Sequence, residues 1–276
     1  MATVGPGALR TAAPSVWLPS APCTPQTCVD GAPSWTSAPR AVARLVTVLT
    51  LIVLGVLLMP LVARASMTAR ERLVRFWCRA IVRAAGVRLR ITGETPATGG
   101  ALLVANHISW LDVPLLAAVR PARMLAKTEV GDWPVAGALA ARGGCLFIDR
   151  DRLRALPLTV DRIAEALRAG TAVAVFPEGS TWCGREQGHF RRAVFQAALD
   201  ARVPVQPVRI RYMMPGGAAA TAPAFVGEDT LLASLWRVAT ARGITAEVVV
   251  RPSLAPGGHP DRKALARTAQ LSVTDP

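Results

Sequence analysis

The chain has few aromatic side chains and few acidic ones. Aromatic residues make up 5% of the 276 residues, and we find no zinc-type spacing of cysteines, no helix-turn-helix pattern and no aromatic-rich strand motif. Nucleic-acid-binding modules usually carry one of these features, so the sequence argues against nucleic acid as a partner. With 18 acidic against 32 basic residues the formal net charge is +14, which favours an anionic membrane surface instead.

Cysteine is also scarce. The five cysteines form no even, regular framework of the kind found in disulfide-rich secreted domains, and two of them lie within apolar runs (Cys23, Cys28, Cys78, Cys145 and Cys183). Reduced thiols in a cytosolic compartment are therefore expected, and we assign these thiols no chemistry. A secretory signal is not predicted either, because the long apolar run begins only after residue 44.

The amino-terminal part predicts a leader followed by a membrane segment. Residues 1–40 are rich in Ala, Pro, Ser and Thr without periodicity, which is typical of disorder. Residues 45–63 carry no charge, and as a helix they would be about 28 Å long, close to the roughly 30 Å hydrocarbon core of a bilayer. This segment can span a membrane. Since Pro60 lies near its end, a half-inserted or buried hairpin helix is the alternative.

Residues 69–85 predict an amphipathic helix. Four arginines form one stripe of it and four apolar residues lie opposite (Arg72, Arg75, Arg79 and Arg83; Leu73, Val74, Trp77 and Ile81). Such a helix suits the headgroup region of a membrane, and packing on the protein's own core is the alternative. Residues 41–85 are thus the expected membrane anchor. Arginines are more numerous on the carboxyl side of the apolar run, which predicts a cytoplasmic location for the rest of the chain.

From residue 86 onward, strand-like runs alternate with helical patterns. The seven runs are residues 87–92, 101–105, 123–127, 145–149, 172–176, 205–212 and 244–250. This alternation predicts an α/β sandwich with a largely parallel sheet. We expect this domain to cover residues 86–252 and residues 253–276 to form a tail with a short helix.

One of the three histidines has a carboxylate within reach. His107 follows the run 101–105 and precedes a helical pattern, so it lies at the carboxyl end of a strand, where open α/β sheets bind ligands. Asp112 can fold back to one ring nitrogen and leave the other free to accept a proton. Ser109 and Asp112 also fit a helix capping box, with Ser109 as the N-cap, and this second role does not exclude the first.

Polar residues follow two more predicted strands. One stretch runs from Gly143 to Arg150, and another from Ala172 to Ser180 ends in Pro-Glu-Gly-Ser. Together with Val203 to Ile210 and the His107 stretch, they resemble the four ordered blocks of the glycerolipid acyltransferases, the family of 1-acyl-sn-glycerol-3-phosphate acyltransferase. The resemblance covers roughly residues 85 to 250. It implies an αβ sandwich of that type behind the membrane helix.

The resemblance also implies a mechanism. His107 matches the general base that deprotonates the acceptor hydroxyl, and Asp112 matches its partner. Asn106 and Ser109 match positions that support the turn. The hydroxyl attacks the thioester of acyl-CoA or an acyl-carrier protein directly, so no acyl-enzyme is needed, in keeping with the lack of a Gly-x-Ser-x-Gly motif. We expect no metal and no resident cofactor.

Arg150 matches the arginine that in the family helps to hold the acceptor's phosphate, and Arg152 and Arg154 add positive charge beside it. An ordinary surface pair of Asp149 and Arg150 is the alternative. Many phosphate-acceptor members have Thr and Arg after Pro-Glu-Gly, where this chain has Ser, Thr and Trp. Arg185 is the candidate substitute for that missing arginine.

The third and fourth blocks imply supporting roles. Glu178 orients site residues or the acceptor, and Gly179 lets the backbone come close to it; Ser180 follows in the same substrate-binding block, and Pro177 fixes the turn. In the fourth block, Pro204 and Pro207 would shape an apolar wall for the acyl chain.

The predicted function is acyl transfer to lysophosphatidic acid, which gives phosphatidic acid at the cytoplasmic side of the cell membrane. Lyso-ornithine lipid is the alternative acceptor, because the acyltransferases for that lipid also lack the arginine after Pro-Glu-Gly. A lipid-binding protein without catalysis and a thioesterase are the other candidates. The pairing of His107 with Asp112 argues against a mere binding protein. We expect His189 and His259 to take no part.

Overall fold

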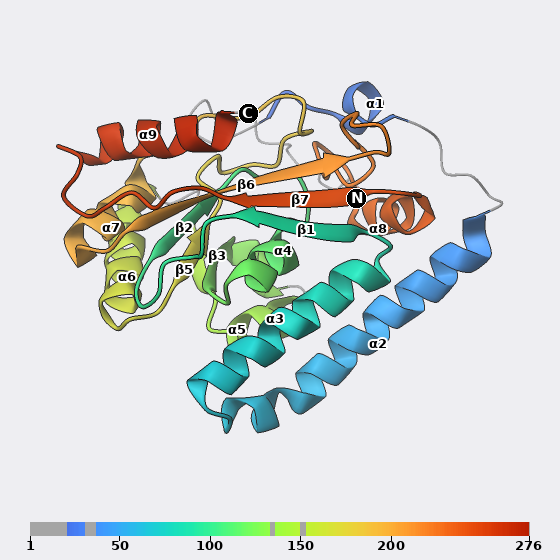
Figure 1. Cartoon of the computed structure of the whole chain (residues 1–276), viewed down its shortest axis with the longest axis horizontal. Helices are drawn as coiled ribbons and strands as arrows, with labels where there is room; N and C mark the ends of the chain where they lie inside the picture. The colour runs from blue at the N-terminus through green and yellow to red at the C-terminus, as the bar shows by residue number, and fades with distance from the viewer. Residues whose placement is uncertain (1–20, 31–36, 133–135, 150–152, 276) are drawn as a thin grey trace, which may run out of the picture.

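A largely parallel sheet is the centre of the molecule. The computed structural model describes residues 21–30, 37–132, 136–149 and 153–275. Within them, seven strands form one sheet in the order β1-β7-β6-β2-β5-β3-β4 (Figure 1). The strands are β1 (Arg88–Gly93), β2 (Leu102–Ala105), β3 (Arg123–Lys127), β4 (Leu146–Ile148), β5 (Val173–Val175), β6 (Val205–Met213) and β7 (Thr245–Val250). Neighbouring strands are parallel except β6 and β7, which confirms the predicted fold class.

Helices cover both faces of this sheet. They are α3 (Met67–Ala84), α4 (Asp112–Val119), α6 (Leu156–Arg168), α7 (Ala193–Ala201), α8 (Leu231–Thr240) and α9 (Arg262–Thr274). The short helix α5 (Ala136–Arg142) packs on the 3-10 helix Thr128–Asp132 instead. Side chains of α3, α4 and α8 contribute to the hydrophobic core on one face. Those of α6, α7 and α9 contribute to the core on the other, so the carboxyl-terminal helix is part of the packed domain.

Strand β2 separates the two cores and positions the site. Leu103 and Ala105 point into one core, whereas Leu102 and Val104 point into the other, and all four are fully buried. An apolar run without alternation is the pattern expected for a central strand covered on both sides. Since β2 pairs with β5 and β6 on its two edges, the residue that follows Ala105 emerges at the middle of the sheet's carboxyl edge.

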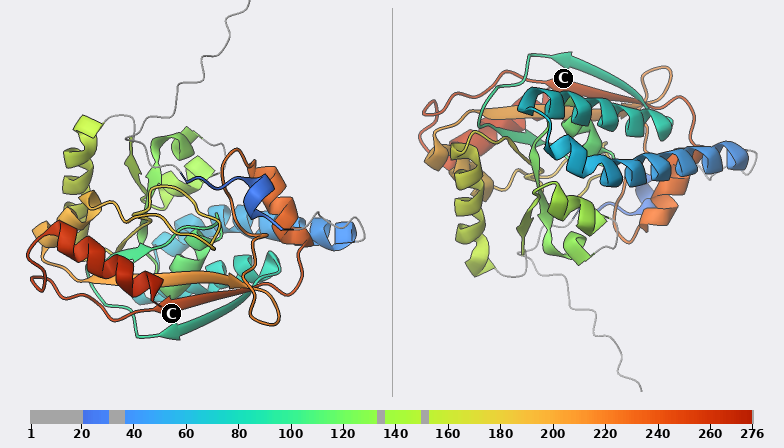
Figure 2. Two further views of the ribbon diagram at one scale, coloured as in Figure 1. Left: turned by 90° about the horizontal axis from the view of Figure 1, so that it is seen from above. Right: turned by 90° about the horizontal axis from the view of Figure 1, so that it is seen from below.

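A helical hairpin precedes the sheet. Helix α2 (Ala38–Ala63) is followed by a short turn, and α3 then runs back along it, as Figures 1 and 2 show. The indole nitrogen of Trp77 in α3 donates to the carbonyl of Leu51 in α2 over 3.1 Å. Arg44 fastens α2 to the end of α8, because its guanidinium donates to the carbonyls of Ala239 and Ala241 over 2.8 and 2.7 Å.

The hairpin exposes a large apolar surface, which we call the apolar face. Its members recur every three or four residues and so lie on one side of α2 (Val46, Leu49, Val53, Leu57 and Leu61). Phe76 of α3 is exposed as well. By length and composition, helix α2 could cross a membrane. Only 6% of its most apolar 18-residue stretch is buried within the protein. The two helices predicted within residues 41–85 are therefore present, and their role as a membrane anchor stays a prediction.

Residues 21–30 differ from the expectation of a disordered leader. They include a short helix, α1 (Pro25–Cys28), and Cys23 is buried against the domain. The backbone nitrogen of Asp30 donates to the hydroxyl of Thr221 over 2.9 Å. Composition could not reveal this because the stabilising contacts come from distant segments. Residues 38–40 of the predicted leader are also ordered, since they form the start of α2, whereas residues 1–20 and 31–36 lie outside the described residues.

Candidate active site

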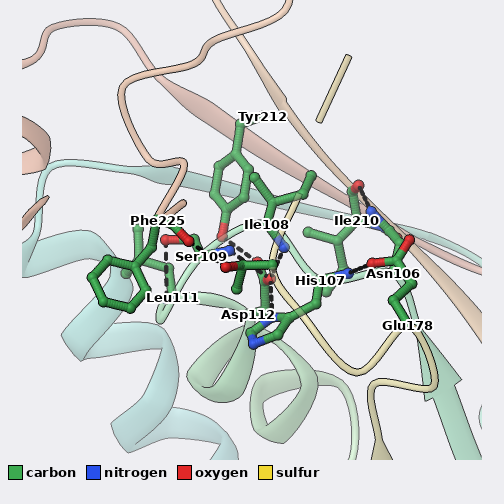
Figure 3. Close-up of polar contacts among 11 residues, drawn as sticks. Asn106, His107, Ile108, Ser109, Leu111, Asp112, Glu178, Ile210, Tyr212 and Phe225 are labelled. Atoms are coloured by element: carbon green, nitrogen blue, oxygen red, sulfur yellow. Dashed lines mark hydrogen bonds and ion pairs between the residues drawn. The ribbon is translucent and has the colours of Figure 1, made fainter. Parts of the chain in front are cut away.

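His107 lies at the carboxyl end of β2, in the loop that leads into α4. Its Nδ1 is 2.8 Å from Oδ2 of Asp112, the first residue of that helix (Figure 3). The imidazole stacks on the ring of Phe176, with centroids 3.9 Å apart and planes within 8° of parallel. The Asp112 side chain is fully buried, whereas 22% of the His107 side chain is exposed. The histidine is therefore held on one side and accessible on another.

The surroundings of Asp112 fix the tautomer of His107. Oδ2 also accepts the backbone N–H groups of Ile108 and Ser109 over 2.6 and 2.8 Å, and Oδ1 accepts the hydroxyl of Tyr212 over 2.6 Å. A carboxyl group that accepts from donors on both oxygens is best satisfied as the ionised carboxylate. His107 then donates from Nδ1, and its Nε2, which has no hydrogen-bond partner among the described residues, keeps a lone pair that can accept a proton.

The expected capping box forms only in part. The carboxylate of Asp112 does reach back to the backbone nitrogen of Ser109, as a capping box requires. The hydroxyl of Ser109, however, accepts from the nitrogen of Leu111 over 3.3 Å, and the N-cap of α4 is Leu111 instead of Ser109. The same carboxylate thus supports the turn and orients the histidine, so the two roles predicted for it are combined.

Tyr212 is a site residue that sequence reasoning missed. It is the single tyrosine of the chain, lies near the end of β6 and is 3% exposed. Burial, followed by the charge of Asp112, raises the pKa of Tyr212 well above its usual value, so the hydroxyl stays a donor at every physiological pH. The available signal was a hydroxyl group in line with Val208 and Ile210, at the end of the apolar face of this strand.

Glu178 supports the backbone of the histidine. One carboxyl oxygen accepts the backbone N–H of His107 over 2.8 Å, and the other accepts that of Gly188 over 3.1 Å. Burial raises the pKa of Glu178 to about 8, although both N–H groups act in the opposite direction. The carbonyl of His107 accepts the N–H of Trp182 over 2.8 Å. The loop after β5 therefore holds both backbone polar groups of the histidine.

The other residues of this loop form its turn. Gly179 has a φ of +75°, which favours glycine, and its nitrogen donates to the carbonyl of Phe176 over 3.1 Å. The carbonyl of Pro177 accepts from Arg191 over 2.8 Å, and Ser180 is half-buried. Asn106 bonds β6 with both ends of its amide, at the nitrogen and the carbonyl of Ile210. Asn106 thus continues the pairing of β2 with β6 up to His107.

Two predicted site residues have partners other than His107, and two more lie outside the described residues. Pro204 accepts from the nitrogen of Leu102, so about 10 Å of strand, at about 3.3 Å per residue, separates it from the Ala105 end of β2 that leads to His107. Arg185 forms an ion pair with Asp30, and both side chains are well exposed. Arg150 and Arg152 lie outside the described residues, whereas Arg154 is exposed in the short 3-10 helix Leu153–Ala155.

Comparison with known proteins assigns the family. The family model described as Acyltransferase matches residues 87–211. The lyso-ornithine lipid O-acyltransferase of Pseudomonas aeruginosa is 41% identical over 205 residues, which cover 74% of this chain and 78% of that protein. The chain belongs to the glycerolipid acyltransferase family.

Two further matches support this family assignment. The 1-acyl-sn-glycerol-3-phosphate acyltransferase of Neisseria meningitidis is 33% identical over 181 residues, 65% of this chain and 71% of that protein. The crystal structure of the 1-acyl-sn-glycerophosphate acyltransferase from Thermotoga maritima shares the fold, with a TM-score of 0.60, 18% identity and coverage of 85% and 94% of the two chains. The protein is therefore an acyltransferase that acts on lysolipids.

Proposed function

We propose that His107 is the general base of a direct acyl transfer from an acyl thioester to the hydroxyl of a lysolipid. The observation that carries this proposal is the contact of 2.8 Å between His107 and the fully buried Asp112, which leaves Nε2 as the free base. The donor is acyl-CoA or an acyl-carrier protein. Transfer is direct because the base acts on the acceptor, and no side chain needs to carry the acyl group.

In this mechanism the acceptor hydroxyl loses its proton to Nε2 of His107 as its oxygen attacks the thioester carbonyl. The new C–O bond forms, the C–S bond breaks, and the thiolate leaves with the proton that the imidazolium returns. Asp112 stabilises the imidazolium formed in the middle of this sequence. Phe176 and the backbone bonds to Glu178 and Trp182 hold the imidazole in place, so little reorientation is needed during the reaction.

We propose lysophosphatidic acid as the acceptor, with its phosphate bound by Arg150. Strand β4 ends at Ile148, two residues before Arg150 in the sequence, and β2 ends at Ala105, two residues before His107; both strands end at the same carboxyl edge of the sheet. A guanidinium binds a phosphate through two parallel hydrogen bonds. The net charge of +14 also favours an anionic lipid.

Arg150→Lys should raise KM for lysophosphatidic acid by roughly fivefold to tenfold, which corresponds to about 1 kcal/mol for one lost hydrogen bond. KM for acyl-CoA should change little. Arg162→Lys, at an exposed position of α6, is the matched control and should change neither constant. An equal effect of Arg150→Lys on donor and acceptor would contradict the phosphate assignment.

Lyso-ornithine lipid is the second candidate acceptor, and two observations favour it. Relatives with that printed activity reach 41% identity, against 33% for the Neisseria meningitidis protein. Arg185, the candidate substitute for the arginine missing after Pro-Glu-Gly, is occupied by Asp30. The two lysolipids should be offered side by side to the purified wild type with one acyl-CoA. A higher kcat/KM for lyso-ornithine lipid would replace the first proposal by the second.

We propose that the hairpin attaches the protein to the cytoplasmic face of the membrane by inserting into one leaflet. Helix α3 runs antiparallel to α2, so a spanning hairpin would carry the arginine stripe of α3 into the bilayer (Figure 1). Each arginine at the bilayer centre costs about 3 kcal/mol or more. Shallow insertion buries the apolar face and leaves the arginines among the headgroups.

Leu57→Glu should lower the partition of the protein onto anionic vesicles by roughly tenfold or more, because burial of a leucine contributes about 1.5–3 kcal/mol. Leu158→Glu on α6 is the matched control, since the two leucines are 68% and 62% exposed. Vesicle flotation measures the membrane partition of the two variants. A cysteine placed at Ser66, in the turn of the hairpin, tests the depth of insertion. If an impermeant reagent labelled it from the far side of the membrane, shallow insertion would be contradicted, because only a spanning hairpin exposes its turn on that side.

A further inference from the structure

Three of the five cysteines converge at the loop after β5. The sulfur atoms of Cys23, Cys28 and Cys183 all lie within 4.8 Å of one another. Cys23 and Cys183 are 3% and 4% exposed, and Cys28 is partly buried at the end of α1. The first two thiols in the chain come from residues 21–30, and the third comes from the loop after β5. The cluster is therefore created by the docking of these two segments.

We propose that Cys23, Cys28 and Cys183 bind a thiophilic metal ion, for which Zn²⁺ is the probe. Thiolate sulfur is the ligand that selects Zn²⁺ and Cu⁺ over harder cations. With Zn–S bonds of about 2.3 Å, a tetrahedral site holds its sulfur atoms about 3.8 Å apart. The observed separations need to contract by about 1 Å or less to reach this geometry. Three thiolates leave a fourth position for a water molecule.

A disulfide and apolar packing are the two other possible roles of the cluster, and each accounts for fewer of the three thiol positions than metal binding does. A disulfide would join two of the sulfurs and leave the third without a function, and each of the three cysteines is a free thiol. Thiols also pack as small apolar groups, but apolar packing does not require three of them to converge at one point, nor one to lie at a partly exposed helix end. Metal coordination accounts for all three positions.

The site would fasten residues 21–30 to the loop that holds the catalytic histidine. Cys183 directly follows Trp182, whose N–H donates to the carbonyl of His107 over 2.8 Å. Residues 21–30 also contact the domain through Asp30, which bonds Thr221 and pairs with the exposed Arg185, and through apolar packing of Ala21 and Val29. A metal ion would add a firmer attachment, because structural zinc sites contribute directly to folding stability. This inference stands whichever lysolipid is the acceptor.

The test is the metal content of the full-length protein, purified in detergent under reducing conditions and dialysed after addition of Zn²⁺. We expect equimolar zinc in the wild type, and equal content in Cys78→Ser and Cys145→Ser, which remove the two cysteines outside the cluster. Cys28→Ser should lose the zinc and still fold, because Cys28 is partly exposed. Zinc should also raise the melting temperature of the wild type by a few degrees, and not that of Cys28→Ser.

Two measurements on the wild type need no variant. Replacement of Zn²⁺ by Co²⁺ should give the strong visible bands of a tetrahedral site and a sulfur-to-cobalt charge-transfer band in the near ultraviolet. Bound zinc should protect three thiols from alkylation. The proposal is overturned if the reduced wild type takes up no zinc, if Cys28→Ser takes up as much, or if cobalt shows no sulfur ligation. A disulfide between any two of these cysteines in freshly lysed cells would overturn it as well.

Discussion

His107→Ala is expected to lower kcat/KM for acyl transfer by about 10²-fold to 10⁴-fold, the usual loss when a general base is removed. Nε2 of His107 is the free basic nitrogen that the structure holds beside a buried carboxylate, and alanine leaves nothing to accept the proton of the acceptor hydroxyl. The measurement is the initial rate of thiol release from acyl-CoA at several concentrations of lysolipid.

The fold should survive this substitution. The histidine side chain is partly exposed, and the backbone bonds of residue 107 to Glu178 and Trp182 do not depend on the imidazole. His189→Ala is the matched control, since His189 is exposed on the loop beyond Glu178 and should keep wild-type rates. Activity of His107→Ala within tenfold of the wild type, in a protein with an unchanged melting temperature, would rule out the general-base role.

Asp112→Asn is expected to lower kcat by about 10²-fold to 10⁴-fold with a smaller effect on folding. Asparagine has the same shape, so its oxygen can take the place of Oδ2 and accept from His107, Ile108 and Ser109. Its NH₂ group then faces Tyr212, whose hydroxyl can turn from donor to acceptor. The bonds are kept, but the negative charge that stabilises the imidazolium is lost.

Two other variants separate the effect of losing the negative charge at residue 112 from the effect of losing its hydrogen bonds. Tyr212→Phe leaves the carboxylate charged but removes one bond to it, so the free energy of unfolding should fall by about 1–3 kcal/mol while kcat changes only severalfold. Asp112→Ala leaves buried N–H donors without an acceptor and should destabilise the fold more than either. Denaturant unfolding and steady-state rates measure the two effects. If Asp112→Asn turned over at a near-normal rate, Asp112 would be a helix-capping residue only.

The sequence alone predicted what depends on near neighbours in the chain. Apolar runs bounded by turns predicted all seven strands, because a buried strand needs a continuous or alternating apolar pattern whatever its partners are. His107 and Asp112 could be paired from their spacing, since a strand end followed by a helix brings them within reach. Their partner Tyr212 could not, because it lies on β6 and meets Asp112 only when β6 pairs with β2.

Only the tertiary structure decided what depends on distant segments. Pro204 belongs to a motif that follows the site blocks in sequence, yet the parallel pairing of β6 with β2 puts it at the end of β2 opposite His107. Residues 21–30 look disordered by composition, and Cys23 and Cys28 gain a third thiol from Cys183 only after docking. A local pattern records the burial and turn preferences of a segment, but it contains no information about which distant surface will cover that segment. That choice is made when the whole chain packs.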